Sequence, residues 1–174
     1  MTITYGKKTA VFILACGSLF AASSQATTID ITGLVIASPC VVNGGNDSLS
    51  VDLGTNIQAA SLLADGDASP WVTKKLTLTN CPNSTTSFSV TFSGTTDTDD
   101  TDYYKNTGTA TNLKLELTNN PASTSAYKNG AKIENVAIGS THAYDLELYA
   151  RAVAKGEVMP GTIEGQVQAT FTYQ

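Results

Sequence analysis

The feature that most constrains the fold of this chain is a period-two alternation over residues 161–173. Every odd-numbered position in this stretch is apolar or glycine, and every even-numbered position is polar. Side chains of a β-strand point alternately to its two faces, whereas those of a helix repeat every 3.6 residues. The pattern therefore predicts a strand with one buried and one solvent-exposed face. The predicted buried face includes Gly161, Ile163, Val167, Phe171 and Tyr173.

A second alternating stretch lies near the other end of the sequence, in residues 27–40. Glycine interrupts its apolar series at the centre, at Gly33, although glycine weakens a strand and fills no space. A closed sandwich would pair both terminal strands with its own sheets, whereas an unclosed sandwich would offer them to other molecules. The apolar positions on the same face as the glycine are Ile29, Ile31, Val35 and Ala37.

The sequence between these stretches is typical of an all-β protein. Thr, Ser, Val and Ile are abundant, and turn residues recur at short intervals. Residues 56–66 are the one segment that favours a short helix. No internal repeat or linker marks a second domain, so we expect one antiparallel β-sandwich. Alternating apolar residues predict strands in residues 48–53, 72–80, 87–92, 112–118 and 143–154.

The start of the sequence has the parts of a secretory signal peptide. Two lysines precede an apolar run that is short for a membrane span, and Ser-Gln-Ala supplies the small residues of a cleavage site. We expect cleavage after Ala26. Lipidation of Cys16 is the alternative, but Leu14 is bulky for a lipoprotein site. The expected parts are a signal peptide at 1–26, an N-terminal arm at 27–39 and a body at 40–174.

Cys40 and Cys81 are the cysteines that remain after the expected cleavage. In an exported protein an even number of cysteines indicates a disulfide. A metal site is disfavoured, because the sequence has no Cys-x-x-Cys pair and only one histidine, His142.

The net charge of −5 and the lack of a basic cluster argue against nucleic acid as a partner. No apolar run after the leader is long enough to span a bilayer.

No sequence motif indicates an enzyme or a cofactor site. Nucleophile, zinc-protease and phosphate-loop motifs are missing, and nothing around His142 would complete a catalytic triad. The acidic run at 97–102 lacks the glycine and distal glutamate of an EF-hand loop, which favours a solvated turn over a calcium site. Trp71, Tyr103 and Tyr104 would suit a ligand platform or packing, and packing is the commoner role.

Four sequence features together resemble the pilins of chaperone–usher fimbriae, and most closely the minor, tip-adaptor pilins of type 1 fimbriae. The first is the alternating arm with its central glycine. The second is the pair "SPC" (38–40) and "LTLTNCP" (76–82), and the third is the stretch 92–120, which contains "YYKNTGTATN". The fourth is the C-terminal strand, with a glycine fourteenth from the end and a penultimate tyrosine.

This resemblance implies an incomplete immunoglobulin-like β-sandwich that lacks its last strand. In such pilins a periplasmic chaperone lends the missing strand, and at the outer-membrane usher the N-terminal arm of the next subunit replaces it. The resemblance implies that Gly33 faces a shallow pocket of the acceptor and that the arm's four apolar residues fill the others. The C-terminal strand would edge the groove and pair with the chaperone, whose basic residues would bind the carboxylate of Gln174.

The implied function is that of a structural subunit exported through the periplasm to a surface fimbria, joined to pilins on both sides and supporting cell adhesion. The alternative is an adhesive pilin that binds a host glycan or protein through its lateral surface. Tip adhesins of this family place a lectin domain before the pilin domain, and this sequence has no room for one. The arm starts thirteen residues before Cys40, which is slightly shorter than the tip-adaptor pattern. The farthest pocket of the acceptor would then meet Thr27, a poor plug, or nothing.

Overall fold

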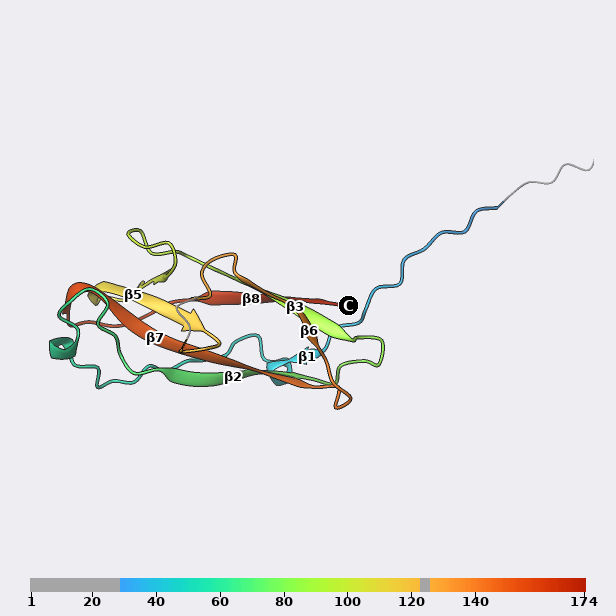
Figure 1. The fold of residues 1–174 in the computed structure, drawn as a ribbon, viewed down its shortest axis with the longest axis horizontal. Helices are drawn as coiled ribbons and strands as arrows, with labels where there is room; N and C mark the ends of the chain where they lie inside the picture. The colour runs from blue at the N-terminus through green and yellow to red at the C-terminus, as the bar shows by residue number, and fades with distance from the viewer. Residues whose placement is uncertain (1–28, 123–125) are drawn as a thin grey trace, which may run out of the picture. The chain divides into compact units, whose positions relative to one another are not determined.

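The computed structural model describes residues 29–122 and 126–174. The expected signal peptide, Cys16 and Thr27 lie outside these described residues. The chain divides into two units, one ending at Leu34 and the other comprising Val35–Gln174. All strands of the described chain belong to the second unit (Figure 1).

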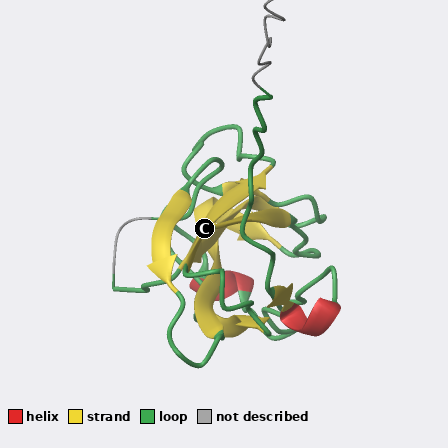
Figure 2. Ribbon diagram, turned by 90° about the vertical axis from the view of Figure 1, so that its right-hand side faces the viewer, coloured by secondary structure: helices red, strands yellow, loops and turns green. Residues whose placement is uncertain are grey.

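The unit Val35–Gln174 is an antiparallel β-sandwich of two sheets, with few helical residues (Figure 2). The larger sheet has the strand order β1-β2-β7-β5-β4, and the smaller sheet has the order β6-β3-β8. The helical segments of the described chain are two single 3-10 turns, η1 at Asn43–Gly45 and η2 at Ala59–Ser61. The strands are β1 Val41–Val42, β2 Val72–Thr79, β3 Ser87–Gly94, β4 Tyr104–Lys105, β5 Thr111–Thr118, β6 Lys132–Ala137, β7 Tyr144–Met159 and β8 Val167–Tyr173.

Apolar residues on the facing sides of the two sheets form the core. Phe88, Val90 and Phe92 alternate along β3 and are almost completely buried, as the period-two pattern predicts. Burying each such side chain contributes roughly 1.5–3 kcal/mol, so the two sheets are held together mainly by these contacts. Their neighbours in the main cluster are Leu76, Leu78, Leu146, Leu148 and the two cysteines, and a second cluster contains Leu62, Leu113, Ala152, Ala154 and Val158.

The predicted disulfide between Cys40 and Cys81 is present. Both cysteines are buried, and they join the residue before β1 to the end of β2. The bond closes a loop with a sequence separation of 41. It therefore fixes the start of the body to the larger sheet and leaves the residues before Cys40 outside the closed loop.

The prediction of a strand at 48–53 is wrong. The side chains alternate as expected, with Leu49, Val51 and Leu53 half-buried and their neighbours exposed. The segment nevertheless belongs to neither sheet, because no strand of the described chain pairs with it. An alternating pattern reports which way side chains face, and a strand also needs a backbone partner.

The predicted C-terminal strand is shorter than expected, since β8 begins at Val167 rather than at residue 161. Residues 161–166 instead form hydrogen bonds with the loop 106–110.

The segment 56–66, expected to favour a helix, contains only η2. Strand β6 was not predicted, because Lys132, Glu134 and Asn135 interrupt its apolar pattern on an exposed sheet edge.

Candidate functional site

The last strand of the sandwich has one unpaired edge. β8 pairs with β3 on one side, and no other strand of the described chain pairs with it. The N–H of Gln174 donates to the Ser87 carbonyl at 3.0 Å, and the N–H of Ser87 donates back at 3.1 Å. Because bonding alternates along an antiparallel pair, the even-numbered residues of β8 bond to β3. The N–H and C=O groups of the odd-numbered residues therefore face the unpaired edge.

The same odd-numbered residues supply the apolar face of β8. Val167, Ala169, Phe171 and Tyr173 are half-buried and the residues between them are exposed, which confirms the predicted alternation. Phe171 and Val167 line a cleft of about 1880 Å³ that runs beside the strand. This volume exceeds the roughly 300–1,000 Å³ of pockets for small molecules. We call this cleft the groove; its other lining residues include Leu49, Val51, Leu53, Leu76, Leu115, Leu117, Leu148 and Ile163.

The second wall of the groove is the unpaired segment 48–53. Its half-buried side chains line the groove together with those of β8. The start of this wall is fixed by the Asn43 side chain, whose Nδ2 donates to the Ser48 carbonyl at 2.6 Å. Both walls thus combine inward-facing apolar side chains with backbone that has no strand partner, which is the environment left by a missing β-strand.

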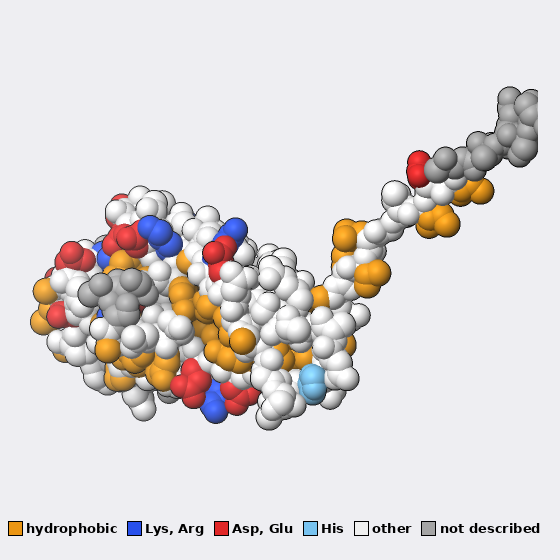
Figure 3. All heavy atoms as spheres, turned by 45° about the vertical axis from the view of Figure 1, so that its right-hand side comes forward, with side chains coloured by type: hydrophobic (Ala, Val, Ile, Leu, Met, Phe, Trp, Pro, Cys, Tyr) orange, Lys and Arg blue, Asp and Glu red, His pale blue; other side chains and the backbone are white. Residues whose placement is uncertain are grey.

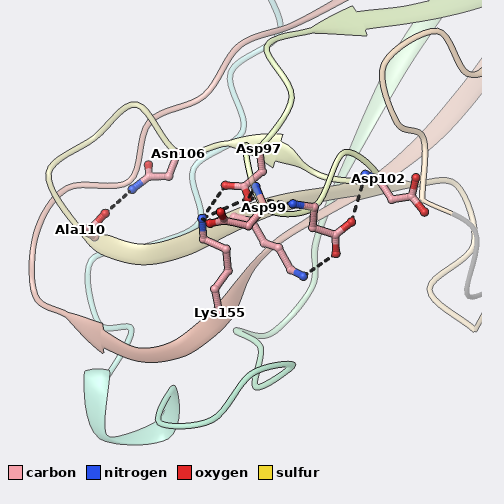
Figure 4. Close-up of polar contacts among 8 residues, drawn as sticks. Asp97, Asp99, Asp102, Asn106, Ala110 and Lys155 are labelled. Atoms are coloured by element: carbon pink, nitrogen blue, oxygen red, sulfur yellow. Dashed lines mark hydrogen bonds and ion pairs between the residues drawn. The ribbon is translucent and has the colours of Figure 1, made fainter.

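Asn106 fixes one end of the groove. Its side chain is buried, donates to the Ala110 carbonyl at 2.8 Å (Figure 4) and accepts from the Glu164 N–H at 2.8 Å. An added Cβ at Gly161 would overlap the backbone of Ala110, and one at Gly165 would overlap Leu115. Close contact with the backbone therefore requires glycine at 161, whereas the Leu115 side chain could shift to accept a Cβ at 165. The "KNTGTA" part of the resemblance motif holds the segment that leads into β8.

The predicted arm has its apolar side chains exposed. Ile29, Ile31 and Val35 are 81%, 92% and 98% exposed, and no strand occurs in residues 29–39. Ala37 is half-buried, and nothing lies within 4 Å of the position that a Cβ at Gly33 would take. In the described chain, therefore, no strand fills the groove, and the alternating arm does not pair with either sheet.

The acidic run at 97–102 is a turn, but it is not simply solvated. Lys155 binds Asp97 at 2.9 Å and Asp99 at 2.7 Å (Figure 4), and the Asp97 side chain is only 3% exposed. Burial opposes ionisation of Asp97, yet the hydrogen bond from Lys155 and the N–H groups of Asp99 and Asp100 hold its pKa below the ordinary value. The described residues contain no group of acidic, histidine or cysteine side chains suited to a metal ion.

Cationic side chains stack on two of the aromatic residues considered as ligand platforms, and the third is buried. Arg151 stacks on the Trp71 ring at 4.1 Å and binds Glu116 at 2.6 Å. Lys114 stacks on Tyr103 at 4.0 Å, and Tyr104 is 2% exposed within the sandwich, where burial raises its pKa to about 12. These three rings pack against the protein itself.

The carbonyl oxygen of His142 accepts a hydrogen bond from the Cys81 N–H at 3.1 Å, which gives the turn before β7 a structural role.

Comparison with known proteins agrees with this geometry. The family model described as fimbrial protein matches residues 29–174. The chain belongs to this family. It is thus a fimbrial subunit of the cell surface, in a family of structural subunits. No helix in the described part of this pilin is long and apolar enough to cross a membrane.

Two relatives match almost the whole pilin. It is 38% identical over 170 residues to the S-fimbrial adhesin protein SfaS of Escherichia coli O6:K15:H31 (strain 536 / UPEC), covering 95% of this chain and 99% of that protein. It is 37% identical over 165 residues to Protein FimG of Escherichia coli (strain K12), covering 94% and 93%.

Solved pilin structures share the fold. The P pilus rod subunit PapA aligns with a TM-score of 0.63 at 18% identity, covering 79% of this chain and 100% of PapA. The P pilus adaptor subunit PapF aligns with a TM-score of 0.52 at 15% identity, covering 79% and 98%. The pilin is therefore an incomplete immunoglobulin-like sandwich that lacks one strand, as the resemblance implied.

Proposed function

We propose that this pilin is a minor adaptor subunit that both accepts and donates a β-strand. Its groove, edged by β8 and lined by Phe171, receives a strand from a periplasmic chaperone and later one from a neighbouring pilin at the outer-membrane usher. Its own arm, residues 27–39, fills the groove of another pilin, and residues 40–174 form the acceptor body. One observation carries this proposal: β8 has a free edge along a large apolar groove, while the apolar arm residues are exposed in the same chain.

Burial and backbone hydrogen bonding would favour strand insertion, and ordering the arm would oppose it. Burial of Ile29, Ile31 and Val35 would contribute roughly 1.5–3 kcal/mol each, or on the order of 5–9 kcal/mol in total. Backbone hydrogen bonds along the free edge of β8 would add about 0.5–1.5 kcal/mol each. Ordering the arm subtracts about 1–2 kcal/mol per residue. The favourable and opposing terms are of similar size, and slow unfolding of the completed sheet would make the joint long-lived.

The glycine of the arm gives the sharpest test of the donor role. A peptide of residues 27–39 is offered to a chaperone-bound acceptor pilin purified from the same fimbrial system, and chaperone release is timed. Gly33→Leu should stall the exchange, because overpacking a close fit costs about 1–3 kcal/mol. Ile31→Asp should stall it as well, because it would bury a charge. Thr32→Ser, on the opposite face, is the matched control and should exchange like the parent.

Two outcomes would count against the donor role. If Gly33→Leu exchanges as fast as the parent peptide, no shallow pocket faces this glycine. If no peptide exchanges with any pilin of the system, residues 27–39 are not a donor strand.

The adaptor role is tested separately, by measuring the copy number of this pilin in purified fibres. A minor adaptor is present in a small fraction of the subunits, whereas a rod subunit is present in most.

An adhesive role is the second candidate, and the name of one relative favours it. SfaS, which is 38% identical, is described as an adhesin. Trp71 is a residue type that suits a ligand platform, although packing is its commoner role and Arg151 covers its ring here. The test is to screen purified fibres with and without this pilin on a glycan array. Equal binding by both fibres would contradict the adhesive role.

A further inference from the structure

The root of the arm is held to the body at two points. The Thr85 side chain, whose residue is 2% exposed, donates its hydroxyl to the Ser38 carbonyl at 2.6 Å. Two residues later, Cys40 is joined to Cys81 by the disulfide. The chain from Ser38 onward is therefore fixed to the body, and the covalent bond keeps this arrangement when the hydrogen bond opens.

This attachment leaves little chain between the body and the last apolar residue of the arm. Ala37 directly precedes the clamped Ser38. An extended chain advances about 3.3 Å per residue. If Ala37 fills a pocket of another pilin, which is the function proposed above and the premise of this inference, that pilin must lie against the end of the body where the arm is rooted.

The surface at this end is continuous and has no Lys, Arg, Asp or Glu side chain. Hydrogen bonds link its segments, since the Ile138 N–H donates to the Thr86 carbonyl at 2.9 Å and the Thr86 N–H donates to the Gln174 carbonyl at 2.6 Å. The chain has 10 Lys and Arg residues and 15 Asp and Glu residues, and none of them lies in residues 79–87, 136–144 or 172–174. The ionisable groups of these segments include the imidazole of His142 and the terminal carboxylate of Gln174. Figure 3 likewise shows no Lys, Arg, Asp or Glu side chain on the body next to the arm root. Interface centres are depleted of charged residues, because charges lose hydration when they are covered.

We propose that this end of the body is a contact surface for the neighbouring pilin that receives the arm. We call it the root face and define it by four exposed residues, Asn83, Ser84, Ser140 and Thr141. Their hydroxyl and amide groups can form hydrogen bonds with the rim of the acceptor groove. The joint between two subunits then consists of the inserted strand and a second contact between the two bodies, which restricts how one subunit tilts relative to the next.

The test uses fibres assembled in the source bacterium, so that the native neighbours are present. The photo-crosslinking residue p-benzoylphenylalanine replaces Ser84 or Ser140, one position at a time. The matched control is the same replacement at Thr73, an exposed hydroxyl residue on β2 outside the root face. Purified fibres are irradiated, and the adducts are identified by mass spectrometry. Both root-face positions should yield an adduct with another pilin, and the control should yield none.

The outcomes separate this inference from the proposed function. If the arm peptide releases no chaperone from any pilin and this pilin is absent from the fibres, the donor role and the root face are overturned together. Incorporation into fibres without adducts from Ser84 and Ser140 would overturn the root face alone. Equal adducts from all three positions would also overturn it, because the contact would then not be confined to this end. Since all three positions are exposed, the replacements leave the core intact.

Discussion

The arm and β8 have the same alternating pattern but different environments. In β8 the odd-numbered side chains are half-buried and the even-numbered backbone groups bond to β3. In the arm, Val35 is 98% exposed and no strand of the described chain pairs with it. The difference shows that an alternating pattern predicts a strand without identifying its partner. In this pilin the missing partner of β8 and the missing partner of the arm are accounted for by the same proposal, strand exchange between subunits.

The largest expected effect comes from leaving the groove empty. A chain of residues 40–174, expressed without a chaperone, should aggregate or be degraded, because the groove exposes apolar surface that folded monomers normally cover. Addition of a donor peptide should keep it in solution with a cooperative thermal transition. Circular dichroism melting with and without peptide makes this comparison. A high-melting monomer without added peptide would contradict the incomplete fold.

Removal of the disulfide should have the next largest effect. Replacement of both Cys40 and Cys81 by alanine should lower the free energy of unfolding of the peptide-filled body by about 4 kcal/mol, because the unfolded chain gains the freedom of an open loop. Denaturant unfolding measures this change. An unchanged unfolding midpoint would show that the body does not depend on this link.

Substitutions along β8 should separate its two faces. Phe171→Ala should destabilise the peptide-filled body by about 3 kcal/mol, because the ring is then covered by the donor strand. Thr170→Ala, the neighbouring control on the exposed face, should change stability by less than about 0.5 kcal/mol. Equal effects at the two positions would contradict the assignment of the inward face.

The smallest expected effect is the acid dependence of the turn 97–102. Asp97 and Asp100 have pKa values below the ordinary 3.8, through contacts with Lys155 and Lys114 respectively. A depressed carboxyl pKa contributes stability above the unfolded value, and this contribution is lost as the pH falls through the folded pKa. Stability should therefore decline below about pH 4, and Asp97→Asn should flatten that decline. Unfolding midpoints between pH 2 and pH 6 test the slope, with Asp52→Asn as an exposed control.

The sequence predicts the β-sandwich architecture, but it does not predict which distant backbone segments pair with each other. The alternation in β2, β3 and β8, the disulfide and the apolar face of the arm follow from local pattern and cysteine count. Residues 48–53 were assigned to a strand because their side chains alternate, but strand formation depends on a partner distant in sequence. The contact between Asn106 and Glu164 also joins distant segments, and a polar residue in a turn motif does not reveal it. The clamp from Thr85 to Ser38 is equally invisible to periodicity.

The free edge of β8 is the central claim, and hydrogen exchange in assembled fibres tests it most directly. The N–H groups of Thr172, Thr170 and Gln168 already bond to β3, so they should exchange slowly in any folded state. If a donor strand fills the groove, the N–H groups of Val167, Ala169, Phe171 and Tyr173 should be equally slow in the fibre, as read residue by residue by mass spectrometry after deuterium labelling. Slow exchange at the even-numbered residues with fast exchange at the odd-numbered ones would show that the edge stays unpaired, which would contradict the account.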